Sequence, residues 1–393
     1  MYILISGIAS YISEPIIAIY LSTQAVSVVF IGIFIGLPSI VSSMFGFLCS
    51  HIVNRLGYRF SFILSQTLYI FYFILLIYSH NIVILICAAF IRGISRILWE
   101  PLLKSALSLN AREHEIETVF KIRYIVICVA AIIGPVMIII LSRLGIALFG
   151  NMIISIILSV LLLFGIIIMP RNEPCKKDKN NAKVSKPARK LRSIFTIRFI
   201  VLGFVILNFF IFMVFSIFEE TIPLALSLNI ANSEIIFSEL LLLNSILGIV
   251  IQISNMRFFP KIKPINSILI GIVFFASSFL LFSIAFTNIN VLIPLMFVAA
   301  ILFTFGETLC LPNMDVVITD ITSIQEREFV YGLSELQSFG FFAGPALFAL
   351  ILERSGASFM FAIAFVISIL LCFSLLIYKK SKCKTYGGLV ETE

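Results

Sequence analysis

Residues 146–169 read IALFGNMIISIILSVLLLFGIIIM, a stretch that contains no Asp, Glu, Lys or Arg. The hydrocarbon core of a bilayer is about 30 Å thick, and an α-helix needs about 20 apolar residues to cross it. In lipid the backbone N–H and C=O groups must pair within the structure, and a continuous apolar run can pair them only as a helix. This stretch therefore predicts a transmembrane helix.

Outward from this run, apolar stretches bounded by charged residues, Pro or Asn divide the whole chain into twelve predicted spans. Their approximate ranges are 2–21, 28–50, 60–78, 82–103, 118–142, 146–169, 198–221, 233–256, 266–287, 291–314, 328–352 and 357–378. We expect the first span to be a membrane helix and not a signal peptide, because no basic region precedes its apolar run.

The composition agrees with a polytopic membrane protein. Hydrophobic residues make up 61% of the 393 residues and charged residues 12%, whereas soluble domains are about 45–50% apolar and about 25% charged. A soluble enzyme, a disordered chain and a disulfide scaffold are thereby excluded. The seven Cys show no paired spacing and the three His are far apart in sequence, so we predict no metal site and no cofactor.

The distribution of Lys and Arg predicts the orientation in the membrane. With the N-terminus inside, 24 of these residues fall in inner segments and two, Arg143 and Arg354, in outer loops. Positive residues concentrate on the cytoplasmic side of membrane proteins. We therefore expect both termini in the cytoplasm and a location in the bacterial cytoplasmic membrane. The net charge of +8 then reflects topology and requires no nucleic-acid partner.

One long polar segment divides the chain after six spans. Residues 170–198 are rich in Lys, Asn and Pro, a composition typical of a solvated linker. The expected organisation has four parts: an N-terminal six-helix bundle (1–169), a basic cytoplasmic linker (170–198), a C-terminal six-helix bundle (199–378) and a cytoplasmic tail (379–393).

The two halves carry similar features in the same order. Ser13-Glu14-Pro15 aligns with Phe218-Glu219-Glu220, and Gly134-Pro135 aligns with Gly344-Pro345. Two further pairs of segments align: Gly46 and Arg55 with Gly248 and Arg257, and Arg96 and Pro101 with Glu307 and Pro312. Across all four pairs, the aligned residues lie 202–211 positions apart in the sequence. The predicted fold is thus an all-α membrane protein with twelve transmembrane helices in two pseudo-symmetric six-helix bundles. Such folds bind substrate near the midplane between the halves and alternate access by rocking.

The loop between the second and third spans carries a family motif. Ser50-His51-Ile52-Val53-Asn54-Arg55-Leu56-Gly57-Tyr58-Arg59 resembles motif A (G-x-x-x-D-R-x-G-R-R) of the major facilitator superfamily, and Asn54 stands where the motif has Asp. The resemblance covers the whole chain and implies a transporter. It also implies that this loop, with Asn54, Arg55, Gly57 and Arg59, acts at the cytoplasmic gate.

Two more segments resemble motifs of this superfamily. The fourth span resembles motif B (R-x-x-Q-G-x-G), with Ala89 at the Arg position, Arg92 at the Gln position and Gly93 at the first Gly. In the fifth span, Gly134-Pro135 resembles the antiporter motif C (G-x-x-x-G-P-x-x-G-G), and the eleventh span carries Gly340-x-x-x-Gly344-Pro345. Small residues allow helices to approach closely. Together these features look like the bacterial drug:proton antiporters.

Ionisable residues inside spans are candidates for the transport site, because charge in a membrane is costly. They are Glu14, Arg92, Arg96, Glu219, Glu220, Glu307 and Glu335. Four-residue spacing puts Arg92 and Arg96 on one helix face. For Glu219, Glu220 and Glu335, contact with water at a span end is the alternative interpretation. For Arg96 and Glu307 the alternative is a static ion pair.

These residues indicate ion-coupled transport. A carboxylic acid in an apolar cavity can load a proton on one side and release it on the other, and a nearby cation displaces that proton. We expect Glu14 to carry the proton or to meet a cationic group of the substrate. Arg96 and Glu307 are expected to form a charge switch between the halves. The chain contains no G-x-x-x-x-G-K-[ST] loop that would indicate ATP-driven pumping.

The sequence therefore predicts a monomeric secondary transporter with a small-molecule substrate, protons and the lipid bilayer as partners. The leading hypothesis is proton-coupled efflux of small apolar or amphipathic compounds by alternating access, and not enzymatic activity. One alternative is proton-coupled uptake of a metabolite or organic anion, with Arg92 and Arg96 as an anion clamp. A non-transporting membrane sensor is the other.

Overall fold

The structure is a computed structural model. It describes residues 2–24, 26–45, 52–53, 55–78, 81–110, 116–146, 148–168, 199–258, 262–288, 291–321 and 337–390.

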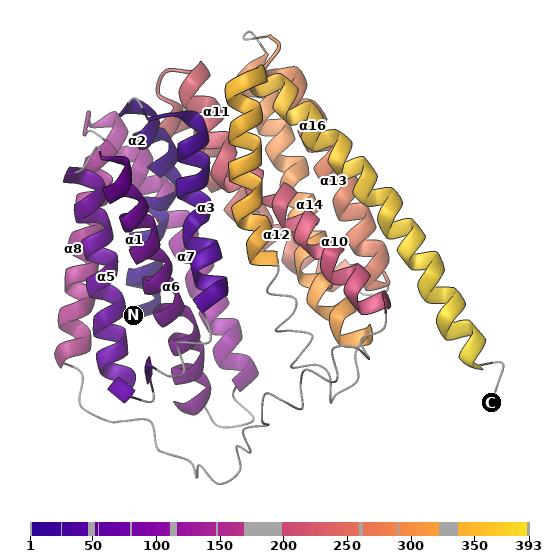
Figure 1. Cartoon of the computed structure of the whole chain (residues 1–393), viewed down its shortest axis with the longest axis horizontal. Helices are drawn as coiled ribbons and strands as arrows, with labels where there is room; N and C mark the ends of the chain where they lie inside the picture. The colour runs from indigo at the N-terminus through magenta and orange to yellow at the C-terminus, as the bar shows by residue number, and fades with distance from the viewer. Residues whose placement is uncertain are drawn as a thin grey trace. The chain divides into compact units, whose positions relative to one another are not determined.

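Helices and short turns make up the described residues (Figure 1). The helical segments of the first half are α1 (Tyr2–Tyr11), the 3₁₀ turn η1 (Glu14–Ile16), α2 (Ile17–Thr23), α3 (Val28–Phe45), α5 (Tyr58–Tyr78), α6 (Ile82–Asn110), α7 (Ile116–Arg143) and α8 (Leu148–Ile168). Those of the second half are α10 (Phe199–Ser216), the π-helical turn η3 (Ile217–Thr221), α11 (Ile222–Asn229), α12 (Ser233–Phe258), α13 (Pro264–Ala285), α14 (Leu292–Ile321) and α16 (Gln337–Val390).

The prediction of an all-α membrane protein is confirmed. Eleven helical segments in the described part of the chain are long and apolar enough to cross a membrane. The last of them, Gln337–Lys380, contains two helices joined at Gly356, whose φ of 80° and ψ of 170° are not helical. Glycine adopts such a positive φ without steric cost. This break corresponds to the boundary predicted between the last two spans.

The chain forms two compact units. Unit 1 comprises Met1–Lys179, Phe218–Ser245 and Pro345–Leu350, and unit 2 comprises Asn180–Ile217, Ile246–Gly344 and Ile351–Glu393. Two segments of the second half of the sequence thus pack with the first half. The division into 1–169, 170–198, 199–378 and 379–393 follows the sequence repeat and stays a prediction.

Helices of unit 1 are joined by hydroxyl groups as well as by apolar side chains. Ser65 on α5 and Ser95 on α6 each donate a hydrogen bond to the other's backbone carbonyl, at 2.9 Å in both directions. The Tyr2 hydroxyl donates to the carbonyl of Gly165 on α8 at 3.0 Å. In a membrane, small polar residues hold helices together where the hydrophobic effect contributes little. These bonds give the site described below a fixed frame.

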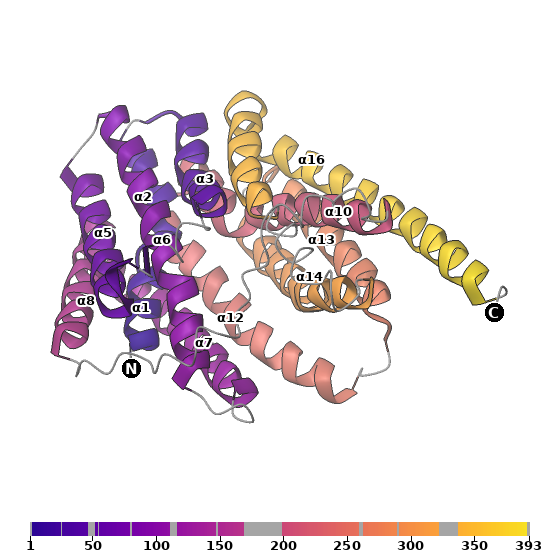
Figure 2. The same ribbon diagram turned by 60° about the horizontal axis from the view of Figure 1, so that its bottom comes forward.

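In unit 2, α13 and α14 run side by side in both views (Figure 2). Gly271 and Gly306 lie at their contact, because a Cβ built on Gly306 would be 2.9 Å from the carbonyl oxygen of Gly271. The Phe303 ring packs against Phe275, with 4.9 Å between the ring centroids. Glycine at the contact lets the two backbones approach, and the aromatic rings fill the space beside them.

Candidate functional site

The first predicted span is interrupted at its ionisable residue. Helix α1 ends at Tyr11, and the 3₁₀ turn of Glu14–Ile16 separates it from α2. Pro15 has no N–H to donate to the helix, which favours a break here. The Ser13 hydroxyl donates to the carbonyl of Ala9 at 3.0 Å and so occupies an acceptor near the end of α1. The break projects Glu14 toward α5 and α6.

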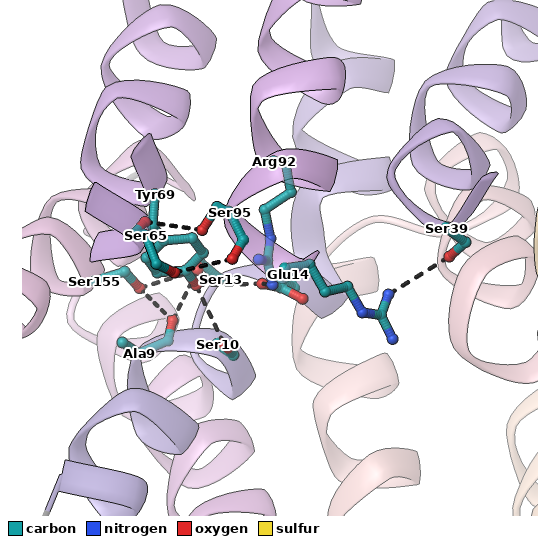
Figure 3. Close-up of polar contacts among 11 residues, drawn as sticks. Ala9, Ser10, Ser13, Glu14, Ser39, Ser65, Tyr69, Arg92, Ser95 and Ser155 are labelled. Carbon is teal, nitrogen blue, oxygen red and sulfur yellow. Dashed lines mark hydrogen bonds and ion pairs between the residues drawn. The ribbon is translucent and has the colours of Figure 1, made fainter. Parts of the chain in front are cut away.

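Glu14 forms an ion pair with Arg92 (Figure 3). An Nη2 hydrogen of Arg92 on α6 is donated to Oε1 of Glu14. The same oxygen accepts a hydrogen bond from the Tyr69 hydroxyl on α5, at 3.2 Å. The Arg92 side chain is 14% exposed and that of Glu14 is 36% exposed. Three helical elements thus meet at one carboxylate oxygen.

Tyr69 contacts both members of this ion pair. Its ring lies under the Arg92 guanidinium, with 4.7 Å between the Arg92 Cζ and the ring centroid. Its hydroxyl oxygen lies 3.3 Å from the hydroxyl of Ser10 on α1. Because the single hydroxyl hydrogen of Tyr69 is donated to Glu14, Ser10 must be the donor in the second bond. Ser10, Tyr69 and Glu14 therefore form a chain of hydrogen bonds.

The frame around the ion pair is also hydrogen-bonded. The buried Ser155 hydroxyl on α8 lies 2.7 Å from the carbonyl of Ala9 and 2.9 Å from the Ser13 hydroxyl (Figure 3). These contacts tie α8 to the end of α1, immediately before the break. The segment just before Glu14 is thus held by α8, and the Glu14 carboxylate itself is held by α5 and α6.

The second half has a related break at the aligned position. Glu219 and Glu220 lie in the π-helical turn Ile217–Thr221 between α10 and α11, and Pro223 follows it. Turns of this kind are frequent at functional sites. Both acids interact electrostatically with Glu14 and with Arg96. The structure therefore brings Glu14, Glu219 and Glu220 into one charged region of unit 1, with Arg92 and Arg96.

Arg96 and Glu307 occupy different surroundings. Arg96 is exposed, and its Nη1 donates to the Ser39 hydroxyl on α3 at 3.5 Å. Glu307 lies on α14 in unit 2, next to the glycine contact between α13 and α14. The predicted charge switch would join residues of the two units, so it stays a prediction. Glu335 lies outside the described residues.

Of the predicted gate residues, Arg59 lies in the first turn of α5, and Arg55 and Gly57 precede this helix. Arg59 donates a hydrogen bond to the carbonyl of Ile167, in the last turn of α8, a position where an arginine satisfies a free helix-end carbonyl. Gly57 has a φ of 80°, which glycine tolerates. Arg55 is exposed, and Asn54 lies outside the described residues. A gating role for these four residues stays a prediction.

The predicted packing glycines lie against neighbouring backbones. A Cβ built on Gly134 of α7 would be 2.7 Å from the carbonyl oxygen of Tyr11. One built on Gly340 would be 3.0 Å from the amide nitrogen of Met213, and one on Gly344 2.5 Å from its carbonyl oxygen. Pro135 and Pro345 follow two of these glycines within α7 and α16. The contact of Gly134 lies three residues before Glu14.

The ion pair could be found from the sequence only in part. The sequence marks Glu14 and Arg92 as candidates, but their pairing depends on how α1 and α6 pack, which no periodicity reveals. Tyr69 and Ser10 carry no signal that separates them from other polar residues in apolar spans. No group of three or more metal-ligating side chains occurs among the residues that the structure describes.

Comparisons with known proteins give the family. The model of the Major Facilitator Superfamily matches residues 1–288 and 261–386. An uncharacterized MFS-type transporter of Bacillus subtilis (strain 168), YqjV, is 23% identical over an alignment of 398 positions. The alignment covers 96% of this chain and 92% of that protein.

Solved structures share the fold at low sequence identity. The nucleoside transporter NupG is 15% identical with a TM-score of 0.81, over 96% of this chain and 97% of that chain. A D-xylose-proton symporter is 12% identical with a TM-score of 0.75, over 95% of each chain. A POT family transporter in complex with 5-aminolevulinic acid is 13% identical with a TM-score of 0.75, over 97% and 95%.

Proposed function

Because the chain belongs to the Major Facilitator Superfamily and is a multi-pass secondary transporter, we propose that it exports small apolar or amphipathic compounds in exchange for protons. In this proposal the Glu14–Arg92 pair is the proton switch. The chain resides in the bacterial cytoplasmic membrane with both termini in the cytoplasm, an orientation supported by the 24 to 2 split of Lys and Arg between the two sides.

The observation that carries the proposal is the ion pair inside the spans. Arginine keeps its charge at all physiological pH values, and a charge within a membrane span is costly unless it is paired. When Glu14 takes up a proton, Arg92 loses its counter-charge while it remains largely buried. Removing one partner of a buried pair is strongly destabilising, so protonation favours a rearrangement of α1, α5 and α6. Proton binding is thereby linked to conformation.

Exchange requires that substrate and proton compete. Glu14, Glu219 and Glu220 place three carboxylates in the charged region of unit 1, against the two arginines Arg92 and Arg96. A positively charged group of a substrate that reaches these acids favours their ionised form and expels a proton. Protons that enter on the opposite side displace the substrate in turn. This competition supports export against a gradient.

Alternating access also needs a closure on the outer side. Contacts in unit 1 join α7 to the start of α12: the Ser142 hydroxyl donates to Oε1 of Glu234 at 2.9 Å, and Arg143 pairs with Glu239 at 3.8 Å. The predicted topology places these residues at the outer ends of their helices. We propose that they form an outer latch, which opens when the transporter faces outward.

Proton-coupled uptake is the second candidate. Arg96 is exposed and donates a long hydrogen bond to Ser39, so its guanidinium could bind an anionic substrate. A proton symporter for D-xylose shares the fold. In this candidate the Glu14–Arg92 pair still carries the proton, but substrate and proton move in the same direction.

A proton-flux assay distinguishes these functions. The purified chain is reconstituted in liposomes that contain a pH-sensitive dye, and a panel of organic cations, neutral aromatic compounds and organic anions is added in turn. We expect apolar or cationic compounds to cause proton movement opposite to their own, with loss of this flux in Glu14→Gln. The exposed acid Glu353 gives the control variant Glu353→Gln, which should retain it. Proton movement in the same direction as an organic anion would establish proton-coupled uptake. The absence of proton flux with every compound would support a non-transporting sensor.

A further inference from the structure

The contacts of Tyr69 go beyond those of a residue that fills the core. Its side chain is 5% exposed, and it meets the carboxylate of Glu14 with its hydroxyl and the guanidinium of Arg92 with its ring face. A tyrosine that only filled space between α5 and α6 would need neither contact. A buried hydroxyl needs a hydrogen-bond partner, and here the partner is one member of the ion pair.

Neighbouring aromatic rings fix the orientation of Tyr69. Phe73 packs edge-on against it with 4.9 Å between centroids, and Tyr72 is stacked at 6.4 Å. Tyr72 in turn stacks on Phe34 of α3 at 6.5 Å. Side chains packed in this way have little rotational freedom. The Tyr69 hydroxyl is therefore held at Glu14 and does not have to be recruited to it.

We propose that Tyr69 is a positioning residue that holds Glu14 against Arg92 and sets the pH at which Glu14 takes up its proton. The proposal rests on the proton role of Glu14 given above. The Tyr69 hydroxyl donates to the carboxylate, and a donor stabilises the ionised form of an acid more than the protonated form. Ser10 donates to Tyr69 in turn, which polarises the Tyr69 hydroxyl and strengthens its bond to Glu14.

Other charged and titratable groups also act on Glu14. They are Arg92 on α6, Tyr72 on α5, and Glu219 and Glu220 on the π-helical turn, and Arg96 on α6 interacts with these two glutamates. Tyr69 is itself neutral, and its side chain contacts both partners of the pair. Its removal changes the hydrogen bond without changing any charge.

The hydrogen bond from Tyr69 to Glu14 determines the direction in which Tyr69→Phe changes the proton affinity of Glu14. Tyr69→Phe keeps the ring under Arg92 and removes the donor to Glu14, so the ionised carboxylate loses stabilisation and Glu14 binds its proton more tightly. The midpoint of the Glu14 titration should move up by about one pH unit, which is a tenfold change in proton affinity. Ser10→Ala removes only the second donor and should move the midpoint in the same direction by less.

Infrared difference spectroscopy of the full chain in lipid measures this titration without a substrate. The carbonyl band of a protonated carboxylic acid is followed against pH, and the part of the band that Glu14→Gln removes is assigned to Glu14. Tyr2→Phe is the matched control, since it deletes a tyrosine hydroxyl of the same unit that donates to the carbonyl of Gly165 and not to Glu14. We expect this control to leave the midpoint within about 0.3 pH units of the wild type, well below one tenfold step.

A double-mutant cycle separates positioning from general destabilisation. If Ser10 acts through Tyr69, Ser10→Ala should have no effect on the midpoint in the Tyr69→Phe background. Equal midpoints for the wild type, Tyr69→Phe and Ser10→Ala, with a Glu14 band present, would overturn the role of Tyr69 and leave the proton role of Glu14 intact. If Glu14→Gln removes no titrating band at all, the proton role of Glu14 is itself overturned.

Discussion

Close packing of α7 against the end of α1 makes Gly134 a sensitive position. A Cβ on Gly134 would be 2.7 Å from the carbonyl oxygen of Tyr11, whereas ordinary contact begins at 3.4 Å. Because the same Cβ would lie closer still to the Cβ of Tyr11, one of the two helices must move by more than about 0.7 Å in Gly134→Ala. Overpacking of this kind costs about 1–3 kcal/mol, while Ala is favoured over Gly inside a helix by about 1 kcal/mol. The net loss of stability is about 0–2 kcal/mol.

A second glycine-to-alanine variant separates the cost of the close contact from the gain in helix propensity. Gly248 lies inside α12, and a Cβ there would be 3.9 Å from its nearest neighbour, the Thr304 methyl carbon. Gly248→Ala should stabilise the chain by about 1 kcal/mol, so the two variants should differ by about 1–3 kcal/mol. Denaturant titration of the purified protein, followed by fluorescence of the single Trp, Trp99, measures both. Equal stability of the two variants would refute the close contact at Gly134.

Three further predictions concern the gates and the topology. Glu239→Arg should open the outer latch and raise maleimide labelling of a cysteine placed on the outer side. Adding Arg143→Glu should restore the pair and reverse this effect, with a coupling energy of about 0.2–1 kcal/mol as for other exposed pairs. Additive effects of the two changes would exclude the pairing. Asn54→Asp should shift the balance between inward- and outward-facing states, measured by the same labelling, and a change of substrate preference alone would contradict a gating role. Single cysteines at positions 179–190 should react only with reagents that reach the cytoplasm, and labelling from outside intact cells would reverse the topology.

The spans could be predicted from the sequence because length and apolarity determine them. The α7 range of Ile116–Arg143 lies close to the predicted 118–142. The break at Glu14 was not predicted, although Pro15 favours it, because a proline can also be accommodated within a helix, as Pro135 is in α7. The π-helical turn at Glu219 has no sequence signature, since it needs one extra residue per turn and not a particular residue type.

The site could be predicted as a set of charges but not as a geometry. Arg92 and Arg96 share a helix face by their spacing, yet the structure directs Arg92 to Glu14 and Arg96 to Ser39. Four residues turn a helix by about 400°, so the two side chains differ by about 40° in direction. That difference is enough to reach different neighbours. The contacts of Tyr69 with Glu14 and Arg92 can be recognised only when α5 is placed beside α1 and α6.

The proposed exchange of substrate for protons depends most on the proton role of Glu14. Its most direct test compares two activities of the Glu14→Gln variant in proteoliposomes, with the transported compound identified by the proton-flux assay. Gln keeps the size and hydrogen-bonding capacity of the side chain but cannot take up and release a proton. We predict that Glu14→Gln retains exchange of labelled for unlabelled substrate and loses accumulation driven by a pH gradient. Wild-type accumulation in Glu14→Gln, together with its loss in Glu307→Gln, would contradict the proton role of Glu14 and assign the proton to Glu307 on α14.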